Sequence, residues 1–213
     1  MGDPIRHPGV RVWAGAPKRA CDILAGLLLL LVAAALLPLV AVAIRLEGRG
    51  SLFFRQERLG KDGVPFVMWK LRTMRADAVP PAAPERKRRD DPRVTRVGRW
   101  LRRASLDELP QTWNVLRGEM SLVGPRPLTA AETESLGPLA RRRLAVRPGL
   151  TGLWQVSGRS DLPPERLLEL DLAYAARCSL WLDLQIVART VPAVLAGWGA
   201  YAIGCCAMRT SAL

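Results

Sequence analysis

The longest apolar run in the chain lies near its N-terminus. Residues 23–44 are 22 consecutive positions without a charged side chain. As an α-helix that rises about 1.5 Å per residue, this run would extend for about 33 Å, which is long enough to cross the hydrocarbon core of a bilayer. A cleaved signal peptide is the alternative, but the run ends at Arg45 without a small-residue cleavage site. The pattern therefore favours a retained membrane segment.

Charges on both sides of this run bear on its topology. Basic residues precede it in the N-terminal arm and follow it at Arg45, Arg49 and Arg55. Because basic flanks favour the cytosolic side, both ends of the segment are expected there. Pro38 lies inside the run and would bend or break a helix. Charge and proline together predict a re-entrant helix that enters and leaves on one face, although a bent spanning helix fits the sequence equally well.

After the apolar run, the hydrophobic spacing changes to that of short strands and amphipathic helices. Residues 51–60 and 64–74 carry β-branched and aromatic side chains on either side of a Gly-Lys-Asp-Gly turn, which predicts a β-hairpin. The proline-rich residues 76–92 predict a mobile loop. Hydrophobic residues at helical spacing over 94–101, set among arginines, predict a basic amphipathic helix. The charged face of this helix is either simply solvated or in contact with phosphates or lipid headgroups.

The C-terminal part of the chain predicts two further helices. Residues 162–177 have the pattern of a helix, and residues 179–200 form an apolar, tryptophan-bearing segment interrupted by Asp183, Arg189 and Pro192. We expect the second segment to lie on a membrane surface, with a second span over residues 190–208 as the alternative. The elements together predict a helix-rich α+β fold with a membrane helix, a short β-hairpin and amphipathic interfacial helices.

Two adjacent carboxylates, Asp107 and Glu108, admit two interpretations. Residues 105–108 fit the capping box S-x-x-E, in which Ser105 and Glu108 would satisfy the first N–H groups of a helix over residues 106–116. Alternatively, one carboxylate is a nucleophile beside phosphate-binding arginines. The two interpretations are compatible, because a helix N-terminus also presents N–H donors to a phosphate.

Arg126 is a second candidate site residue, since it lies between Pro125 and Pro127. The fixed φ angles of the two prolines make this loop rigid. An arginine held in this way is suited to bidentate contact with a phosphate. A solvated loop arginine is the simpler alternative.

Composition narrows the class of partner. The chain has 32 Lys and Arg against 19 Asp and Glu, a formal net charge of +13. This excess indicates a polyanionic partner, such as nucleic acid, an anionic bilayer or a phosphorylated substrate. The four cysteines form no C-x-x-C pair and His7 is the sole histidine, so neither a Cys/His zinc site nor a histidine-based triad is expected. Walker A and dinucleotide-binding glycine motifs are also absent from the sequence.

Four blocks of sequence carry a resemblance to a known family. They are KLRTM (70–74), DPRVTRVGRWLRRASLDELPQTWNVLRGEMSLVGPRPL (91–128), VRPGLTGLWQVSGR (146–159) and SLWLDLQIVARTV (179–191). In this order they resemble the bacterial sugar transferases, specifically the small monotopic polyprenol-phosphate phosphoglycosyl transferases. The resemblance implies transfer of a sugar-1-phosphate from a UDP-sugar to undecaprenyl phosphate with release of UMP, the first membrane step of exopolysaccharide or other glycoconjugate synthesis.

The resemblance also implies roles for individual residues. Asp107 would be the nucleophile that forms a covalent aspartyl-phosphosugar in a ping-pong scheme. Glu108 would act as a base or, with Asp107, as a ligand of the Mg²⁺ that the family uses. The substrate-binding residues implied are Arg102, Arg126, Lys70, Pro125 and Pro127. The chain departs from the family at Leu37, where a serine often precedes the proline of the membrane helix.

The chain is accordingly divided into four parts: a basic arm (1–17), a membrane-inserted helix (18–48), a cytosolic catalytic domain with interfacial helices (49–201) and a tail (202–213) containing Cys205 and Cys206. The predicted location is the bacterial inner membrane, with the catalytic domain on the cytosolic face among membrane lipids. A membrane-anchored nucleic-acid-binding or scaffold protein is the alternative from another class. No nucleic-acid partner is expected, because only 6% of residues are aromatic and could stack on bases.

Overall fold

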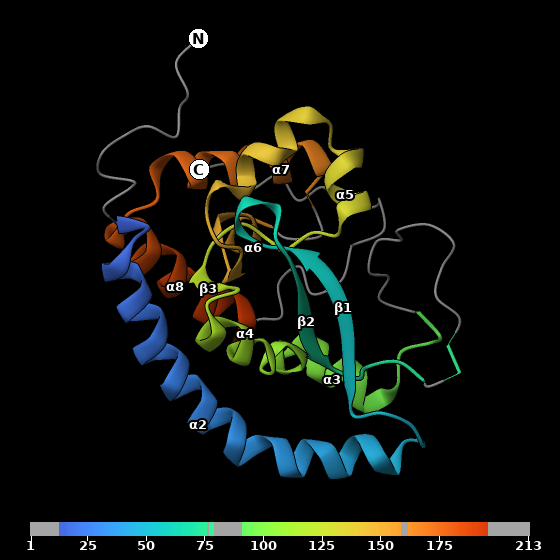
Figure 1. Ribbon diagram of the computed structural model, residues 1–213. Coiled ribbons are helices and arrows are strands. Elements are labelled where there is room, and N and C mark those ends of the chain that lie inside the picture. Colours follow the sequence, from blue (N-terminus) through green and yellow to red (C-terminus); the bar gives the residue numbers. More distant parts are fainter. Residues whose placement is uncertain (1–12, 76, 79–90, 159–161, 196–213) are drawn as a thin grey trace.

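The computed structural model describes residues 13–75, 77–78, 91–158 and 162–195. In these ranges a long helix, α2 (Ala16–Leu46), wraps around one side of a mainly helical domain that contains two small sheets (Figure 1). The predicted helix-rich α+β class is therefore confirmed. The N-terminal arm up to residue 12, most of the loop predicted over residues 76–92, and the C-terminal tail with Cys205 and Cys206 lie outside the described residues.

Helix α2 contains the whole apolar run and continues through Pro38. Figure 1 shows that α2 bends along its length, as expected of a helix in which a proline removes a backbone hydrogen bond. Among the described residues, α2 is the one helix long and apolar enough to cross a membrane, and only 17% of its apolar window is buried. The exposed leucines and valines of α2 therefore form an extensive hydrophobic surface.

Both ends of α2 are attached to the same domain. Near the N-terminal end, Arg19 donates hydrogen bonds of 2.6 Å to the carbonyl oxygens of Val115 and Leu116. Near the C-terminal end, Ile44 belongs to a buried hydrophobic cluster with Leu101. The helix consequently lies across the domain and does not project away from it.

The predicted β-hairpin is confirmed. Strand β1 (Phe53–Leu59) pairs antiparallel with β2 (Pro65–Leu71), and a short 3₁₀ turn, η1 (Lys61–Gly63), connects them. Phe66 and Met68 of β2 are buried in a hydrophobic cluster. The hairpin therefore has one face in the core, which fixes the register of its strands.

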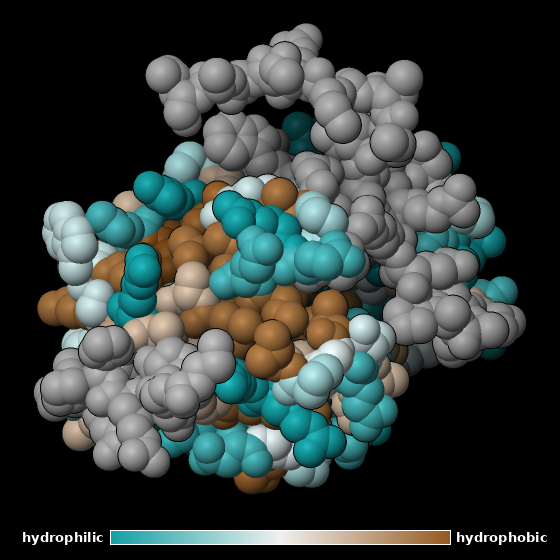
Figure 2. All heavy atoms as spheres, turned by 90° about the horizontal axis from the view of Figure 1, so that it is seen from above, coloured by the Kyte–Doolittle hydropathy of each residue, from teal (hydrophilic) through white to brown (hydrophobic). Residues whose placement is uncertain are grey.

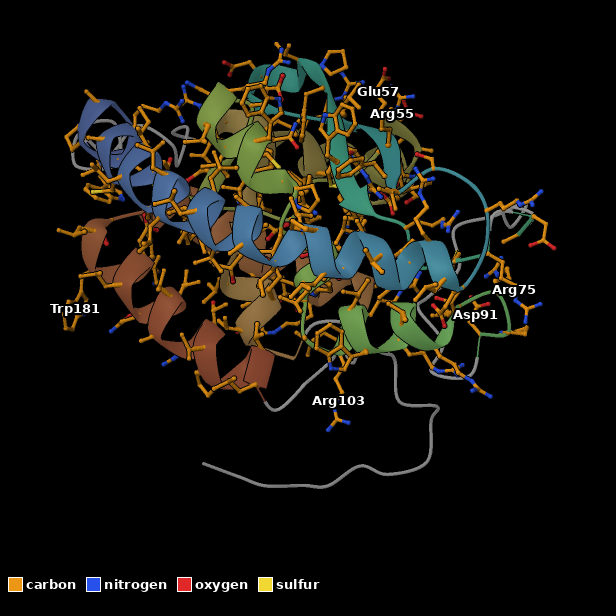
Figure 3. The ribbon with its side chains drawn as sticks, turned by 90° about the horizontal axis from the view of Figure 1, so that it is seen from below. Arg55, Glu57, Arg75, Asp91, Arg103 and Trp181 are labelled. Carbon is orange, nitrogen blue, oxygen red and sulfur yellow. The ribbon has the colours of Figure 1, made fainter. Side chains whose placement is uncertain are left out.

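The predicted basic amphipathic helix is α3 (Arg96–Arg103). Thr95 caps its N-terminus by accepting a hydrogen bond of 2.9 Å from the Gly98 N–H. Leu101 is fully buried on one side of α3, whereas Arg103 points away from the domain (Figure 3). The buried side fixes α3 beneath the hairpin, and its basic face remains outward.

The helix predicted over residues 106–116 is wrong in its first part. Leu106–Glu108 form a 3₁₀ turn, η2, and the α-helix α4 spans only Gln111–Arg117. Ser105 adopts a left-handed conformation with φ 54°, and its side chain makes no capping hydrogen bond. The predicted capping box is therefore not formed. Pro110 directly precedes α4. Because proline has no N–H, it cannot donate the hydrogen bond that would continue η2 into α4.

A second sheet is present that the hydrophobic pattern does not predict. Strand β3 (Ser121–Val123) pairs in parallel with β4 (Gly149–Thr151). In this pairing and just beyond it, the backbones of Gly124, Gly149 and Gly152 approach so closely that a Cβ atom on any of them would overlap a neighbouring backbone atom. This contact requires glycine at all three positions and brings the loop after β3 against β4.

The remaining elements are α5 (Ala130–Ser135), η3 (Pro138–Ala145), α6 (Leu153–Val156), α7 (Pro164–Arg177) and α8 (Leu180–Leu195). Thr129 and Glu132 form a capping box at the start of α5. Helix α7 confirms the helix predicted over residues 162–177. The main hydrophobic core lies where β3 meets α7 and α8, around Tyr174 and Ile186.

Helix α8 corresponds to the apolar segment that was expected on a membrane surface. It lies beside α2 in both ribbon views (Figures 1 and 3). Its Trp181 points away from the domain (Figure 3). Trp181 is 70% exposed, and several apolar side chains of α8 are exposed with it. Figure 2 shows hydrophobic side chains as a band on the molecular surface, bordered by hydrophilic ones. Surface of this kind is typical of a protein that contacts a membrane.

Candidate active site

A cavity of about 650 Å³ opens between α2, α8 and residues 102–109. Leucines and alanine of α2 and valines of α8 line its apolar part. Four candidate residues from the sequence line its polar part: Arg102, Asp107, Glu108 and Arg126. The fold thus brings residues from five separate stretches of the chain to one cavity that has a charged end and an apolar wall. Pro38, by contrast, lies in α2 away from the residues that line this cavity.

Asp107 lies in η2 and is 6% exposed. The left-handed Ser105 reverses the chain at the end of α3, and the 3₁₀ turn then directs the following residues. A non-glycine residue with positive φ is a strained conformation, of a kind that clusters at functional sites. The backbone of Asp107 therefore lies in a 3₁₀ turn and not in the first turn of an α-helix.

Glu108 pairs with Lys70, which lies near the end of β2. The Lys70 Nζ is 2.6 Å from the Glu108 Oε1, and both side chains are largely buried. Lys70 was expected as a phosphate contact, and in this structure its ammonium group pairs with Glu108. The pair also places one positive charge next to the two carboxylates of the site.

Arg102 lies in the last turn of α3 and lines the cavity beside Asp107. Its Nε donates a hydrogen bond of 2.9 Å to the hydroxyl oxygen of Thr73, which follows β2. This contact fixes one edge of the guanidinium. The hairpin therefore orients Arg102 as well as Glu108.

Arg126 lies over the ring of Trp154 in α6, with 5.2 Å between its Cζ and the ring centroid. This cation–π arrangement sets the plane of the guanidinium where it lines the cavity. The flanking Pro125 and Pro127 are both buried. Neither proline lines the main cavity, but Pro127 lines a small hollow that continues from it toward Lys70.

Three buried or largely buried ion pairs surround the site, and the sequence analysis did not identify them as pairs. They are Lys18–Asp183, Arg58–Glu132 and Arg143–Asp171. Burial lowers the pKa of Arg58 and raises the pKa of Asp171, and in each case the charge of the partner acts in the opposite direction. One sequence signal could have indicated that Arg58 is paired: it is an arginine on the face of the predicted hairpin that is buried.

The first of these pairs, Lys18–Asp183, joins α2 to α8. Asp183 accepts hydrogen bonds from the Trp13 Nε1 at 2.9 Å and from the Tyr174 hydroxyl at 2.7 Å, besides the ammonium group of Lys18. Burial, with the adjacent Asp183 charge, raises the pKa of Tyr174 above its ordinary value, so its hydroxyl remains a donor. This network closes the end of the cavity that is formed by α2 and α8.

The carboxylates of the site fit a magnesium ion that is shared with a substrate. Within the part of the chain that the structure describes, no cluster of three or more His, Cys, Asp or Glu side chains could hold a metal by itself. Asp107 and Glu108 are adjacent and line the same cavity. Mg²⁺ is usually bound through one or two carboxylates plus substrate phosphates, so this donor set fits such an ion.

Comparison with known proteins agrees with the resemblance. The family model for bacterial sugar transferases matches residues 13–197. The chain is 43% identical over 212 residues to the exopolysaccharide production protein ExoY of Sinorhizobium fredii, with 93% of this chain and 94% of that protein covered. It is 47% identical over 203 residues to the UDP-glucose:undecaprenyl-phosphate glucose-1-phosphate transferase of Caulobacter vibrioides, with coverage of 91% and 75%.

A third relative is longer than this chain. The undecaprenyl-phosphate glucose phosphotransferase of Komagataeibacter xylinus is 46% identical over 193 residues, which are 84% of this chain but only 36% of that protein. The shared region is the one that contains the carboxylate pair and the Pro-Arg-Pro loop in this chain. The family model matches residues 13–197 of the chain, and these relatives are more than 40% identical to it. The chain therefore belongs to the bacterial sugar transferase family.

Proposed function

We propose that this transferase moves a sugar-1-phosphate from a UDP-sugar to undecaprenyl phosphate, releases UMP, and acts in exopolysaccharide synthesis. The observation that carries the proposal is the cavity in which Asp107 lies with Arg102 and Arg126 next to an apolar wall. A phosphorylated sugar donor requires the charged end, and a lipid acceptor requires the apolar one. The name of the Caulobacter relative supports both the UDP-sugar donor and the undecaprenyl phosphate acceptor, and the name of the Komagataeibacter relative supports the acceptor.

In the proposed first step, the Asp107 carboxylate attacks the phosphorus that carries the sugar. A bond forms between the carboxylate oxygen and phosphorus, and the bond from phosphorus to the bridging oxygen breaks, so that UMP leaves with the bonding electrons. In the second step, the phosphate oxygen of the acceptor attacks the same phosphorus and releases Asp107. A covalent intermediate lets one small cavity accommodate a hydrophilic donor and a lipid acceptor in turn.

The arginines and the paired carboxylate support this chemistry. Attack of a carboxylate on a diphosphate is opposed by like charge, which the guanidinium groups of Arg102 and Arg126 would neutralise. Asp107 and Glu108 would hold Mg²⁺ together with the donor phosphates, and the ion would supply further positive charge at the reacting phosphoryl group. Lys70 would keep Glu108 oriented for that role.

The acceptor and the membrane position are supported by α2 and α8. Their apolar side chains line the cavity on one side and are exposed on the outside. Because both ends of α2 contact the same domain, we propose that α2 is re-entrant and that the catalytic domain lies on the cytosolic face of the bacterial inner membrane. The phosphate of a membrane lipid would then reach Asp107 without leaving the bilayer surface.

Replacement of Asp107 by asparagine tests the proposal. We expect Asp107→Asn to lower UMP release from UDP-glucose, with undecaprenyl phosphate in detergent micelles, by at least about 1,000-fold, because an amide is a poor nucleophile. The exposed Asp62→Asn in the hairpin turn is the matched control and should retain full activity. Mass spectrometry of wild-type protein given donor alone should find a sugar-phosphate on Asp107.

Three outcomes would contradict the proposal. Near-normal turnover by Asp107→Asn would remove this residue as nucleophile, and UMP release only in the presence of acceptor, without an adduct, would favour direct transfer. Salt-sensitive nucleic-acid binding that survives Asp107→Asn, in a wild-type protein that releases no UMP from any UDP-sugar, would support the nucleic-acid-binding alternative.

A further inference from the structure

The loop 125–127 is held at every one of its backbone carbonyl oxygens. The Pro125 oxygen accepts a hydrogen bond of 2.8 Å from the Gly149 N–H. The Arg126 oxygen accepts one from Nη2 of Arg143, and the Pro127 oxygen accepts one of 3.3 Å from Nη1 of Arg58. Two of the three residues are prolines without an N–H, and the remaining N–H, that of Arg126, bonds to the Asp171 carboxylate, so carbonyl contacts supply the rest of the hold on this segment.

Two of these three contacts come from arginines that are themselves fixed by carboxylates. Arg143 is 2% exposed and Asp171 of α7 is fully buried, and the Arg143 Nε lies 3.1 Å from the Asp171 Oδ2. One planar guanidinium therefore joins α7 to the Arg126 carbonyl. A lysine could not reproduce this bridge, because it presents a single ammonium group in place of the fork.

The second arginine is anchored in the same manner on the other side of the loop. Arg58 of β1 is 8% exposed and pairs with Glu132 of α5. Glu132 also accepts a hydrogen bond of 2.8 Å from the Thr129 N–H. Arg58 is thus oriented by the capping box of α5 while it donates to Pro127.

Stability alone does not explain two buried ion pairs beside one loop. Removing two charges from water is costly, and hydrophobic residues of similar volume often give equal or greater stability. The two pairs add precise geometry, because each holds a carbonyl of the loop whose Arg126 lines the same cavity as Asp107. A displacement of about 1 Å in such a group can slow a reaction by about 100-fold.

We propose that Arg143 with Asp171, and Arg58 with Glu132, are positioning residues that hold the Arg126 guanidinium at the phosphate subsite of the cavity. The proposal rests on the proposed function for the identity of the phosphate ligand. Neither Arg143 nor Arg58 lines the cavity, so both act through Arg126 and not by touching the substrate.

A double-mutant cycle tests the proposal. Arg143→Lys is expected to lower kcat/KM for UMP release about 10- to 100-fold, mainly through a higher KM for the UDP-sugar. In an Arg126→Ala background, the same substitution should change kcat/KM less than about twofold, since the group it positions is gone. Equal losses in the two backgrounds would show a purely structural role and overturn the proposal.

Two control variants separate positioning from general destabilisation. Arg166→Lys alters an exposed ion pair on the same helix as Asp171 and should leave both kcat and KM unchanged. Ile186→Val removes one buried methyl group from the main core and should lower the melting temperature without raising KM. A KM increase in Ile186→Val as large as that of Arg143→Lys would contradict the proposal.

Hydrogen exchange provides a measurement that does not depend on activity. Exchange of the amides in peptides covering residues 121–128 should be at least about tenfold faster in Arg143→Lys than in wild type, and unchanged in Arg166→Lys. Unchanged exchange in Arg143→Lys would overturn the proposal even if the wild-type protein released no UMP. Absence of UMP release from wild type would by itself overturn the proposed function, so the two failures are distinguishable.

Discussion

Asp107 and Arg126 line the same cavity, but the chain holds them in different ways. The backbone at Asp107 takes its conformation from sequence neighbours, namely the left-handed Ser105, the 3₁₀ turn η2 and Pro110, and the Lys70–Glu108 pair ties this turn to β2. Arg126 is placed by contacts from distant segments, at separations of 17 residues to Arg143 and 69 residues to Arg58. We therefore call the turn around Asp107, whose backbone conformation is set by neighbouring residues, the local half of the site, and the loop around Arg126, which is held by distant segments, its tertiary half.

The largest expected effect comes from breaking the tertiary half. Gly149→Ala would place a Cβ atom into the backbone of Gly124, where the parallel strands leave no space. We expect a loss of about 3 kcal/mol in the free energy of unfolding, together with loss of UMP release, because Arg126 follows the displaced segment. Urea denaturation followed by tryptophan fluorescence measures the first effect.

A clear contradiction of that prediction would be a Gly149→Ala variant that unfolds at the wild-type urea concentration. The close approach of the two backbones would then relax at little cost. Ile186→Val serves as the matched control, since it removes core volume without touching the loop and is expected to cost only about 1 kcal/mol.

An intermediate effect is expected from the local half of the site. Ser105→Val forces a β-branched residue into φ 54°, which costs about 1–2 kcal/mol, and should lower kcat about 10- to 100-fold by shifting Asp107. Ser105→Gly permits the same φ without strain and should keep at least half of the wild-type activity. Steady-state UMP release by the two variants makes the comparison.

If Ser105→Gly proved as inactive as Ser105→Val, the hydroxyl of Ser105 would matter more than its backbone conformation. If both variants retained full activity, the turn would not be what places Asp107. Either result would weaken the contrast between a local and a tertiary half of the site.

The smallest expected effect concerns the pH dependence of the ion pair between Arg58 and Glu132. Burial tends to raise the pKa of Glu132, but the charge of Arg58 and the Thr129 N–H outweigh it, so this pKa lies below its ordinary value of 4.5. A lowered carboxylate pKa contributes stability above the unfolded-state pKa and loses it as pH falls through the folded-state pKa. We therefore expect the stability difference between wild type and Glu132→Gln to shrink below about pH 4.5.

Urea denaturation of both proteins between pH 7 and pH 3 measures this difference. If the difference in unfolding free energy stayed constant down to pH 3, the ionised form of Glu132 would contribute nothing to the ion pair with Arg58. The exposed Glu169→Gln is the matched control and should show little pH dependence of its own.

Several elements could be predicted because their signal is local. The apolar run defines α2, alternation and a glycine turn define the hairpin, and helical spacing defines α3 and α7. The capping-box prediction failed at Ser105 for a physical reason. The motif specifies which groups can bond but not the backbone conformation of the cap, and here a left-handed residue and a following proline prevent the helix from starting.

In the candidate site, too, the identity of the residues could be predicted from the sequence but their contacts could not. Its carboxylates and arginines were named from motifs in the sequence, and the structure places Arg102, Asp107, Glu108 and Arg126 around one cavity. The pairing of Lys70 with Glu108 could not be predicted, because a strand end and a turn 38 residues later meet only in the fold. The same holds for the buried pair that fixes Arg126.

The sequence by itself determined the family, the membrane helix, the hairpin and the identity of the charged residues, because each depends on composition or on spacing within a short segment. Only the tertiary structure decided how those charges are paired. The parallel contact of β3 with β4 and the pairing of Arg143 with Asp171 join segments 28 residues apart. Such contacts depend on the burial of backbone and charge when the chain closes on itself, and that burial leaves no periodic pattern along the sequence.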